Sequence, residues 1–334
     1  MSIRVHSQFN FFPPVTAAQS KTAAFARGFF TFLESQQVRA AVLHGGEDGF
    51  ERELSDVDFV VDHRTFPILP ELIAAYCAQS GWQLCQILRH ETTAAFCVCS
   101  AIDDPSCVVA LDACSDYQRN GTLFLNAGSL LKNRKVLPWG GYCLAPATEL
   151  CYRFAKAAAK GKDPAESAAE FAAYPEEVRR DCAAWLESQW GISPSSWDVA
   201  GLDPALNSLR DKSNLRPSLT QAAALGRVTS RILHPTGLIV IVGRDDFEAI
   251  ATRLEQVFSH LYFRRTRKAA QWHPAMLKDL VTTTLIILPE IGALWTKLIP
   301  EDCIHRLEST HDGKSQCQTM AGLLHERCMR REIR

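Results

Sequence analysis

The chain has 334 residues, with 36 lysines and arginines against 37 aspartates and glutamates, so its formal net charge is −1. A nearly neutral chain creates no overall electric field that would attract nucleic acid or an anionic membrane surface. The sequence therefore gives no strong signal of nucleic-acid binding. The length is large for one domain and predicts two or three, each with a substantial core.

The apolar segments predict neither a secretory signal nor a membrane span. Between Ser2 and Ser20 the only lysine or arginine is Arg4, and the apolar pair Phe11-Phe12 is followed at once by two prolines. The stretch from Val281 to Ile299 is interrupted by a proline, a glutamate and a lysine, which disfavours a bilayer span. We therefore expect a soluble, cytoplasmic protein.

Twelve cysteines are scattered along the chain without a single Cys-x-x-Cys pair. Because no secretion signal is expected, the spacing does not predict a disulfide framework. Buried free thiols acting as small hydrophobes are the expected alternative.

The first predicted element is an amphipathic helix from Thr22 to Gln37, which should cover one face of a sheet. An apolar strand from Ala40 to Leu43 follows and stops at the pair Gly45-Gly46. After nine further residues a second strand carries Asp56 and Asp58 between apolar side chains. The pattern predicts a strand, a glycine turn, a connection and a second strand.

Successive side chains on a strand point to opposite faces, so Asp56 and Asp58 should project together from one face. Val57, Phe59 and Val61 should fill the core on the other face. Carboxylate oxygens suit Mg²⁺, which is usually held by one or two carboxylates together with substrate phosphates. The alternative is a plain turn followed by a strand with two solvent-facing aspartates.

Clustered carboxylates repel one another when no metal is bound. Replacing both Asp56 and Asp58 by asparagine is therefore expected to leave the stability of the metal-free protein unchanged, or to raise it modestly. Glycines at positions 45 and 46 would let the backbone approach a phosphate closely, because they have no Cβ.

A helix and three strands are predicted next, and together they suggest a small mixed sheet with helices on one side. The last strand brings Asp112 to the same face as Val108 and Ala110, where it offers a third carboxylate. The predicted ranges are Phe66 to Ser80 for the helix, ended by Gly81, and Leu84 to Arg89, Ala94 to Cys99 and Cys107 to Asp112 for the strands.

Two glycines, nine residues, Asp-x-Asp and a later strand with Asp112 resemble the signature of the DNA polymerase β-like nucleotidyltransferase superfamily. The resemblance covers about Lys21 to Cys143. It implies transfer of a nucleoside monophosphate from a nucleoside triphosphate to an acceptor hydroxyl. Asp56, Asp58 and Asp112 would then be the catalytic residues and would hold two Mg²⁺ ions.

The resemblance also implies roles for residues around the three aspartates. Asp112 would orient or deprotonate the acceptor hydroxyl, and Gly45 and Gly46 would hold the triphosphate with a hydroxyl contact from Ser55. Related nucleotidyltransferases often supply a lysine to the triphosphate from a helix after the sheet, which makes Lys156 a candidate.

Two of these neighbours have ordinary alternatives. Lys156 and Lys160 lie four residues apart on one helix face, where they would form a solvated lysine pair. His44, next to the glycine turn, would either touch a substrate or serve in packing or capping.

The apolar patterns in residues 146–234 predict an all-helical segment in which prolines and glycines separate the helices. The expected helices are Ala147 to Ala159, Ala165 to Tyr174, Glu176 to Gln189 and Leu219 to Leu233.

The last segment begins with an apolar strand, Gly237 to Gly243, and a helix from Phe247 to Phe258, which together form the frame of a P-loop. The loop itself is missing, because Glu248, Ala249 and Ile250 stand where a glycine, a lysine and a hydroxyl residue belong. Asp245 and Asp246 add further negative charge. We predict a degenerate P-loop that does not bind phosphate in the usual way, and kinase activity is disfavoured.

Arg264, Arg265, Arg267 and Lys268 form the densest basic cluster, which would either meet an anionic partner or make a solvated charged face. The whole order resembles a bacterial arrangement in which a nucleotidyltransferase-like domain and a helical linker precede a thymidylate-kinase-like domain. That arrangement is often found among surface-polysaccharide genes.

We expect the α/β fold class, with a nucleotidyltransferase-like domain at residues 1–145, a helical domain at 146–234 and a degenerate P-loop kinase-like domain at 235–334. The alternative to an enzyme is a non-catalytic scaffold or binding protein linked to surface-polysaccharide biosynthesis. The missing P-loop supports that alternative.

Overall fold

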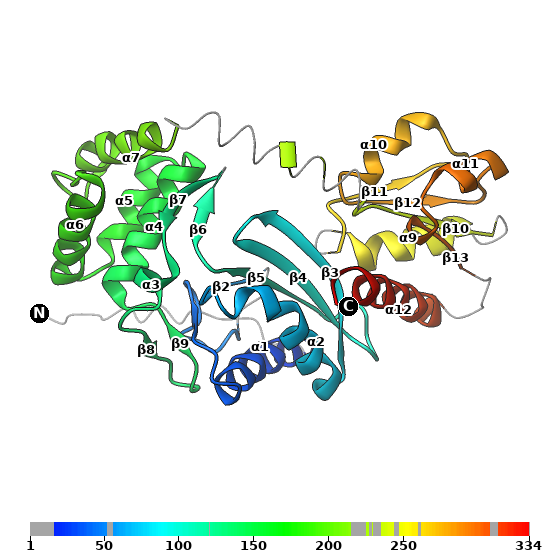
Figure 1. Ribbon diagram of the computed structural model, residues 1–334, viewed down its shortest axis with the longest axis horizontal. Helices are drawn as coiled ribbons and strands as arrows, with labels where there is room; N and C mark the ends of the chain where they lie inside the picture. The colour runs from blue at the N-terminus through cyan, green and yellow to red at the C-terminus, as the bar shows by residue number, and fades with distance from the viewer. Residues whose placement is uncertain are drawn as a thin grey trace, which may run out of the picture.

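The computed structural model is a mixed α/β structure with one mixed sheet, one parallel sheet and a helical segment between them in sequence (Figure 1). The structure describes residues 17–51, 56–119, 121–214, 225–226, 229, 235–243, 247–259, 262–307 and 313–333.

The larger sheet has seven strands in the order β3-β4-β5-β2-β1-β9-β8. The pairs β2–β5 and β1–β9 are parallel and the other neighbours are antiparallel, so the sheet is mixed, as expected. Its strands are β1 (Ala40–Val42), β2 (Val57–Val61), β3 (Trp82–Glu91), β4 (Ala94–Ala101), β5 (Val108–Cys114), β8 (Lys135–Val136) and β9 (Tyr142–Cys143).

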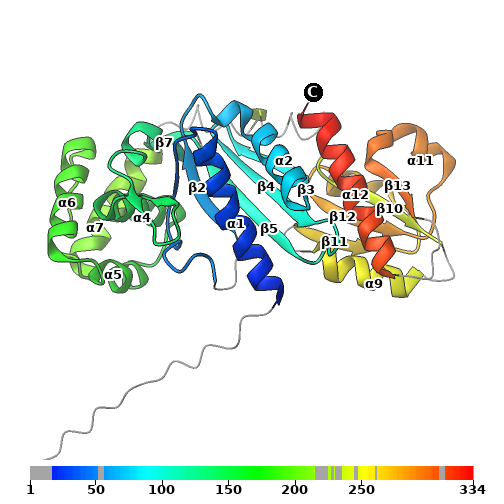
Figure 2. The same cartoon turned by 90° about the horizontal axis from the view of Figure 1, so that it is seen from below.

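Helices α1 (Ala17–Ser35) and α2 (Leu69–Ser80) cover one face of this sheet (Figure 2). A 3₁₀ turn, η1 (Phe66–Ile68), leads into α2, and Gly81 ends α2 with a left-handed φ of 74°, which glycine adopts without strain. The predicted alternation on β2 is confirmed, because Val57, Phe59 and Val61 are all buried in the core beneath these helices.

The opposite face of the sheet is also covered, so the expectation of helices on one side only is wrong. Ala41, Leu43 and Val60 pack there in one core with helix α4, while Cys85 and Val98 pack against the carboxyl-terminal segment. The sequence pattern did not reveal this, because small apolar side chains on a strand suit either partial exposure or a packed interface.

The middle segment is helical and contacts the sheet through α4. Pro146 at its first turn and Gly161, with a φ of 65°, begin and end α4. The segment and the hairpin before it comprise β6 (Tyr117–Arg119), β7 (Thr122–Leu125), α3 (Ala127–Leu130), α4 (Pro146–Lys160), α5 (Pro164–Ala172), α6 (Glu176–Trp190) and α7 (Val199–Asn214).

Helix α7 is the one described helix of this segment that the sequence did not predict. Gly201 and Pro204 lie in its first two turns and resemble helix breakers. Asp198 caps the helix by accepting a hydrogen bond from the Gly201 amide at 3.0 Å, and the buried Leu206 anchors it to the core. Most of the predicted helix at 219–233 lies outside the described residues.

The smaller sheet has four parallel strands in the order β11-β12-β10-β13, with helices on both faces. The strand and helix predicted at its start are confirmed as β10 and α9. Its elements are β10 (Leu238–Val242), α9 (Phe247–Phe258), β11 (Arg265–Lys268), η2 (Pro274–Met276), α10 (Leu277–Leu280), β12 (Thr284–Leu288), α11 (Ala293–Leu298), η3 (Glu301–Cys303), β13 (Ile304–Leu307) and α12 (Gly313–Glu332).

Helix α12 lies between the two sheets (Figure 2). On one side His325 Nδ1 lies 2.9 Å from the Leu84 carbonyl oxygen of β3. On the other side Met320 and Leu324 pack in the core of the four-stranded sheet. The two sheets therefore share the helix, while the division of the chain into three domains remains a prediction.

All twelve cysteines are buried and free, as expected from their spacing. The basic cluster lies on and just before the edge strand β11, where Arg267 pairs with Asp279 at 2.7 Å and Lys268 with Glu255 at 3.2 Å. Among the described helices, none is both long enough and apolar enough to cross a bilayer.

The entry to β10 generates a prediction about stability. A Cβ on Gly237 would lie 2.6 Å from Leu280 Cα and 2.7 Å from the Leu280 carbonyl oxygen. Both are backbone atoms, so a change of side-chain rotamer cannot relieve the clash. Gly237→Ala should therefore lower the free energy of unfolding by about 1–3 kcal/mol. A Cβ at Gly243, at the other end of the strand, meets nothing within 4 Å among the described residues, so Gly243→Ala should be close to neutral. Equal urea midpoints for the two variants would contradict the packing at Leu280.

Candidate active site

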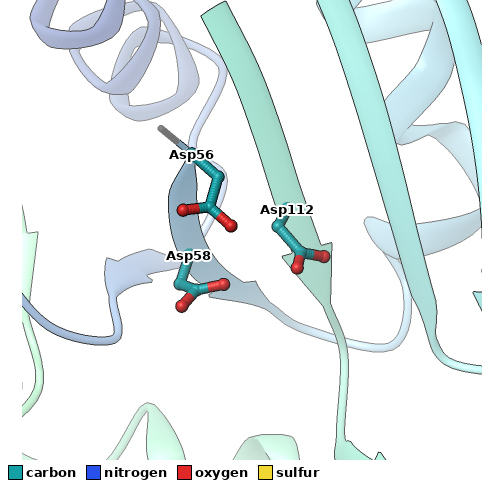
Figure 3. Close-up of side chains that lie close together, drawn as sticks. All are labelled: Asp56, Asp58 and Asp112. Atoms are coloured by element: carbon teal, nitrogen blue, oxygen red, sulfur yellow. The ribbon is translucent and has the colours of Figure 1, made fainter. Parts of the chain in front are cut away.

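Asp56, Asp58 and Asp112 converge on one side of the larger sheet (Figure 3). Each offers a carboxylate oxygen, and these oxygens lie within 4.8 Å of one another. Asp58 on β2 is the direct register partner of Asp112 on β5. The placement expected from strand parity is therefore confirmed, while the catalytic and metal-binding roles remain predictions.

The fold explains this convergence through the alternation on two neighbouring strands. Val109, Leu111 and Ala113 of β5 are buried beneath α1 and α2, so Asp112 must point to the opposite face. The same alternation on β2 sends Asp58 to that face. Adjacent strands lie about 4.8 Å apart, which brings two in-register carboxylates close together.

Lys156 and His44 both contact Asp58. Lys156 Nζ lies 2.6 Å from Asp58 Oδ2, and His44 Nε2 lies 2.7 Å from the same oxygen. The side chain of Lys156 is 18% exposed and that of Asp58 is 13% exposed, so the pair is largely buried. The solvated-lysine alternative is therefore wrong for Lys156.

Lys156 is largely withdrawn from solvent because of the way α4 packs on the sheet. Leu150 and Phe154 bury one side of the helix in the core that it shares with Ala41 and Val60 of the sheet. Lys156 extends from α4 toward β2, and its ammonium also lies 5.3 Å from the Tyr152 ring centroid. His44 stacks on the same ring at 6.0 Å, so its observed role combines packing with a contact to Asp58.

Asp58 is held in its ionised form. Burial raises its pKa, but the hydrogen bond from His44 and the charge of Lys156 outweigh burial and leave the pKa well below its usual range. The expected effect on stability of replacing both Asp56 and Asp58 stays a prediction, but the contact with Lys156 argues that Asp58 by itself stabilises the protein. The Asp58 carboxylate is paired with the partly buried ammonium of Lys156.

The aspartates open into a cavity of about 180 Å³ that is lined by both acidic and basic side chains. Lys156, Lys160 and Arg119 supply the positive charge. The Tyr117 hydroxyl, also in the wall, is buried and has no hydrogen-bond partner in the part of the chain that the structure describes. The lining residues are Leu43, Asp56, Asp58, Glu91, Ala94, Asp112, Cys114, Asp116, Tyr117, Gln118, Arg119, Tyr152, Lys156 and Lys160.

The glycine pair, Gly45 and Gly46, is not among the residues that line this cavity. Gly45 has a φ of 72°, and the carbonyl oxygen of the buried Gly46 accepts a hydrogen bond from Trp139 Nε1 at 2.7 Å. This contact fixes the turn that follows β1. Triphosphate binding by Gly45 and Gly46 remains a prediction, and Ser55 lies outside the described residues.

The three carboxylates fit a hard divalent cation. All the donor atoms are oxygens, they lie within 4.8 Å, and they face a cavity rather than the core. One oxygen of Asp58 already accepts bonds from Lys156 and His44, so full coordination by Asp58 requires the ammonium to move. A triphosphate that enters the cavity would offer Lys156 another anionic partner.

Several wall residues were not singled out from the sequence. Asp116 accepts a hydrogen bond from the Ala127 amide at 2.8 Å and lies 3.2 Å from His63 Nε2. Arg119 and Tyr117 belong to the hairpin that directly follows β5. Their closeness to Asp112 in the sequence was an available signal, because a strand end and its following turn usually stay together.

A scan against protein-family models and searches of curated proteins and of solved structures found no match for this chain.

The contact between Asp58 and Lys156 generates a prediction for the metal-free protein. Asp58→Asn should lower the free energy of unfolding by about 1–3 kcal/mol, because Lys156 would keep a partly buried charge without its carboxylate. In a Lys156→Met background the same change should cost clearly less, with a coupling energy of about 1–2 kcal/mol in a double-mutant cycle. Asp103→Asn, which breaks an exposed pair with Lys21, serves as the control. Additive effects of the two changes would contradict the pairing.

Proposed function

We propose that this protein transfers a nucleoside monophosphate from a nucleoside triphosphate to an acceptor hydroxyl, with Mg²⁺ as cofactor. The observation that carries the proposal is the meeting of Asp56, Asp58 and Asp112 at one cavity that Lys156 and Lys160 also line. Carboxylates recruit the cation and ammonium groups attract phosphates, so the cavity combines the two charges that a metal-bound triphosphate needs.

Asp112 is the proposed proton acceptor. The acceptor oxygen attacks the α-phosphorus, a new oxygen–phosphorus bond forms, and the bond to the β-phosphate oxygen breaks to release pyrophosphate. The hydroxyl proton passes to the Asp112 carboxylate. Bound Mg²⁺ would neutralise charge on the reacting phosphate, with Asp56, Asp58 and Asp112 as its protein ligands.

Lys156 is proposed to change partners when the nucleotide binds. In the structure its ammonium donates to Asp58 Oδ2 at 2.6 Å. When a cation occupies the carboxylates, that positive charge becomes redundant and the ammonium is free to contact the triphosphate. Lys160, one helical turn further along α4, extends the positive charge of the same wall.

The carboxyl-terminal segment is proposed to lack nucleotide chemistry of its own. Glu248 is exposed in the first turn of α9, directly after β10, where the P-loop frame would place its phosphate-binding end. A carboxylate there opposes an anionic ligand. Asp245 and Asp246 lie outside the described residues.

A non-catalytic scaffold or binding protein is the second candidate, and one contact favours it. Lys156 pairs with Asp58 at 2.6 Å, as in an ordinary structural ion pair. The two candidates differ in whether Mg²⁺ changes the affinity for nucleotide.

Metal-dependent nucleotide binding provides the direct test. Isothermal titration with ATP, GTP, CTP and UTP should show binding to at least one of them that requires Mg²⁺. Asp112→Asn should weaken this Mg²⁺-dependent binding by about tenfold or more, because one of the three carboxylates is lost. Asp103→Asn, an exposed aspartate outside the cavity, should leave it unchanged. Binding that is equally tight with and without Mg²⁺ would favour the scaffold.

The basic wall generates a second binding prediction. Lys160→Gln should weaken triphosphate binding about two- to fivefold, as expected for an exposed charge at the cavity, and should affect a monophosphate less. Lys162→Gln is the matched control, since Lys162 lies just beyond α4 and pairs with Glu170 at 3.5 Å instead of lining the cavity. An equal loss in both variants would indicate a general effect of net charge.

A further inference from the structure

A second cavity, of about 300 Å³, lies between the edge strand β3 and the last turns of α12. It shares no residue with the aspartate cavity. Its wall combines an apolar part with three arginines and is formed by Cys85, Gln86, Ile87, Leu88, Arg89, Thr236, Leu324, Arg327, Cys328, Arg331 and Glu332.

Arg327 is the buried member of the three, with 5% of its surface exposed. Its Nη2 donates to the carbonyl oxygens of Pro235 at 2.5 Å and Gly237 at 3.0 Å, which fixes the guanidinium beside the start of β10. These partners are neutral and do not balance its charge. Buried charges are normally paired, because an uncompensated charge in a protein interior is costly.

The nearest carboxylate to Arg327 is already used by another arginine. Asp302 Oδ2 lies 4.0 Å from Arg327 Nε, but only 2.6 Å from Arg331 Nε. Burial opposes ionisation of Asp302, yet Arg331 and Arg327 outweigh it and lower its pKa. Burial and repulsion from Arg331 in turn lower the pKa of Arg327, whose charge is incompletely compensated.

The third arginine, Arg89, pairs with Glu332 at 3.3 Å at the rim of the cavity. Within the described part of the chain, the cavity and its ion pairs thus contain three guanidinium groups and two carboxylates. The site has an excess of one positive charge beside an open volume.

Gln86 on β3, across the cavity from α12, also has a polar atom without a hydrogen-bond partner among the described residues. The pairing of β3 with β4 slips between Leu84 and Gln86, and this bulge puts Gln86 opposite Val98, whose side chain faces the carboxyl-terminal core. Gln86 Oε1 and Arg327 Nε are both buried without a hydrogen-bond partner among the described residues. Arg327 Nε is a donor that an oxyanion can satisfy, whereas Gln86 Oε1 is an acceptor and needs a donor such as the hydroxyl of a protonated ligand.

We propose that this cavity binds a small organic oxyanion, a phosphate or a carboxylate on a compact body, whose negative charge balances the three arginines. Guanidinium groups recognise such oxyanions through paired N–H donors. Thr236 adds a hydroxyl, and Ile87, Leu88 and Leu324 provide apolar contact for the body. This inference does not rest on nucleotidyl transfer, because it involves none of the residues of the aspartate cavity.

The test measures the melting temperature of the full chain against inorganic phosphate and, separately, against acetate, with chloride at matched ionic strength as the reference. At least one of the two anions should raise the melting temperature by about 2–6 °C in a saturable way. A response to phosphate alone or to acetate alone identifies the preferred head group. No response to either anion overturns the proposal.

The variant Gln86→Glu decides where the anion binds. It is nearly isosteric and brings a carboxylate to the cavity, so it should raise the melting temperature in chloride and abolish the anion response. Gln83→Glu makes the same change on the same strand, where the side chain donates to Ser100 at 3.3 Å outside the cavity, and should keep the response. A full anion response in Gln86→Glu would overturn the proposal.

Arg89→Gln provides an independent variant, because its side chain is 48% exposed and its loss threatens the fold little. It leaves two guanidinium groups against two carboxylates, so the excess charge disappears. The anion-induced shift should fall to less than half of that of the wild type. An undiminished shift would contradict the charge count.

Discussion

The contact between Asp58 and Lys156 connects the sheet, the helical segment and the candidate chemistry. At 2.6 Å it joins β2 to α4, two elements that share one hydrophobic core. Without that packing the ammonium would remain in water, and the three carboxylates would repel one another without compensation. The ion pair therefore compensates part of the carboxylate charge and places a positive charge where a triphosphate is proposed to bind.

The local part of this arrangement was predictable from the sequence. The alternation of Asp58 with Val57 and Phe59 fixes which face each side chain takes, since the period of a strand is two residues. Gly81 and Gly161 end their helices with left-handed backbone conformations, as their positions after apolar helical patterns indicated. These inferences involve neighbours in the chain and require no knowledge of tertiary contacts.

The contacts between distant segments were not predictable in this way. The partner of Lys156 is 98 residues away, and no local pattern distinguishes a lysine that faces a carboxylate from one that faces water. Helix α12 is a similar case. It is wedged between β3 and the four-stranded sheet, so its apolar side chains lie on more than one side and give no single stripe. Helix α7 was not predicted for a local reason. Gly201 and Pro204, which usually break helices, lie near its capped start.

The aspartate cavity and the cavity beside α12 place charge in opposite ways. At the aspartates a surplus of carboxylates is partly balanced by Lys156, which suits a cation followed by an anionic nucleotide. Beside α12 a surplus of arginines has too few carboxylates, which suits an anion alone. The central claim concerns the first cavity. It is tested most directly by anomalous diffraction from crystals grown with Mn²⁺ and a non-hydrolysable nucleoside triphosphate. We expect a manganese peak in contact with Asp56, Asp58 and Asp112, with the Lys156 ammonium moved from Asp58 to the triphosphate. A map with no manganese at these aspartates and with Lys156 still bound to Asp58 would contradict the account.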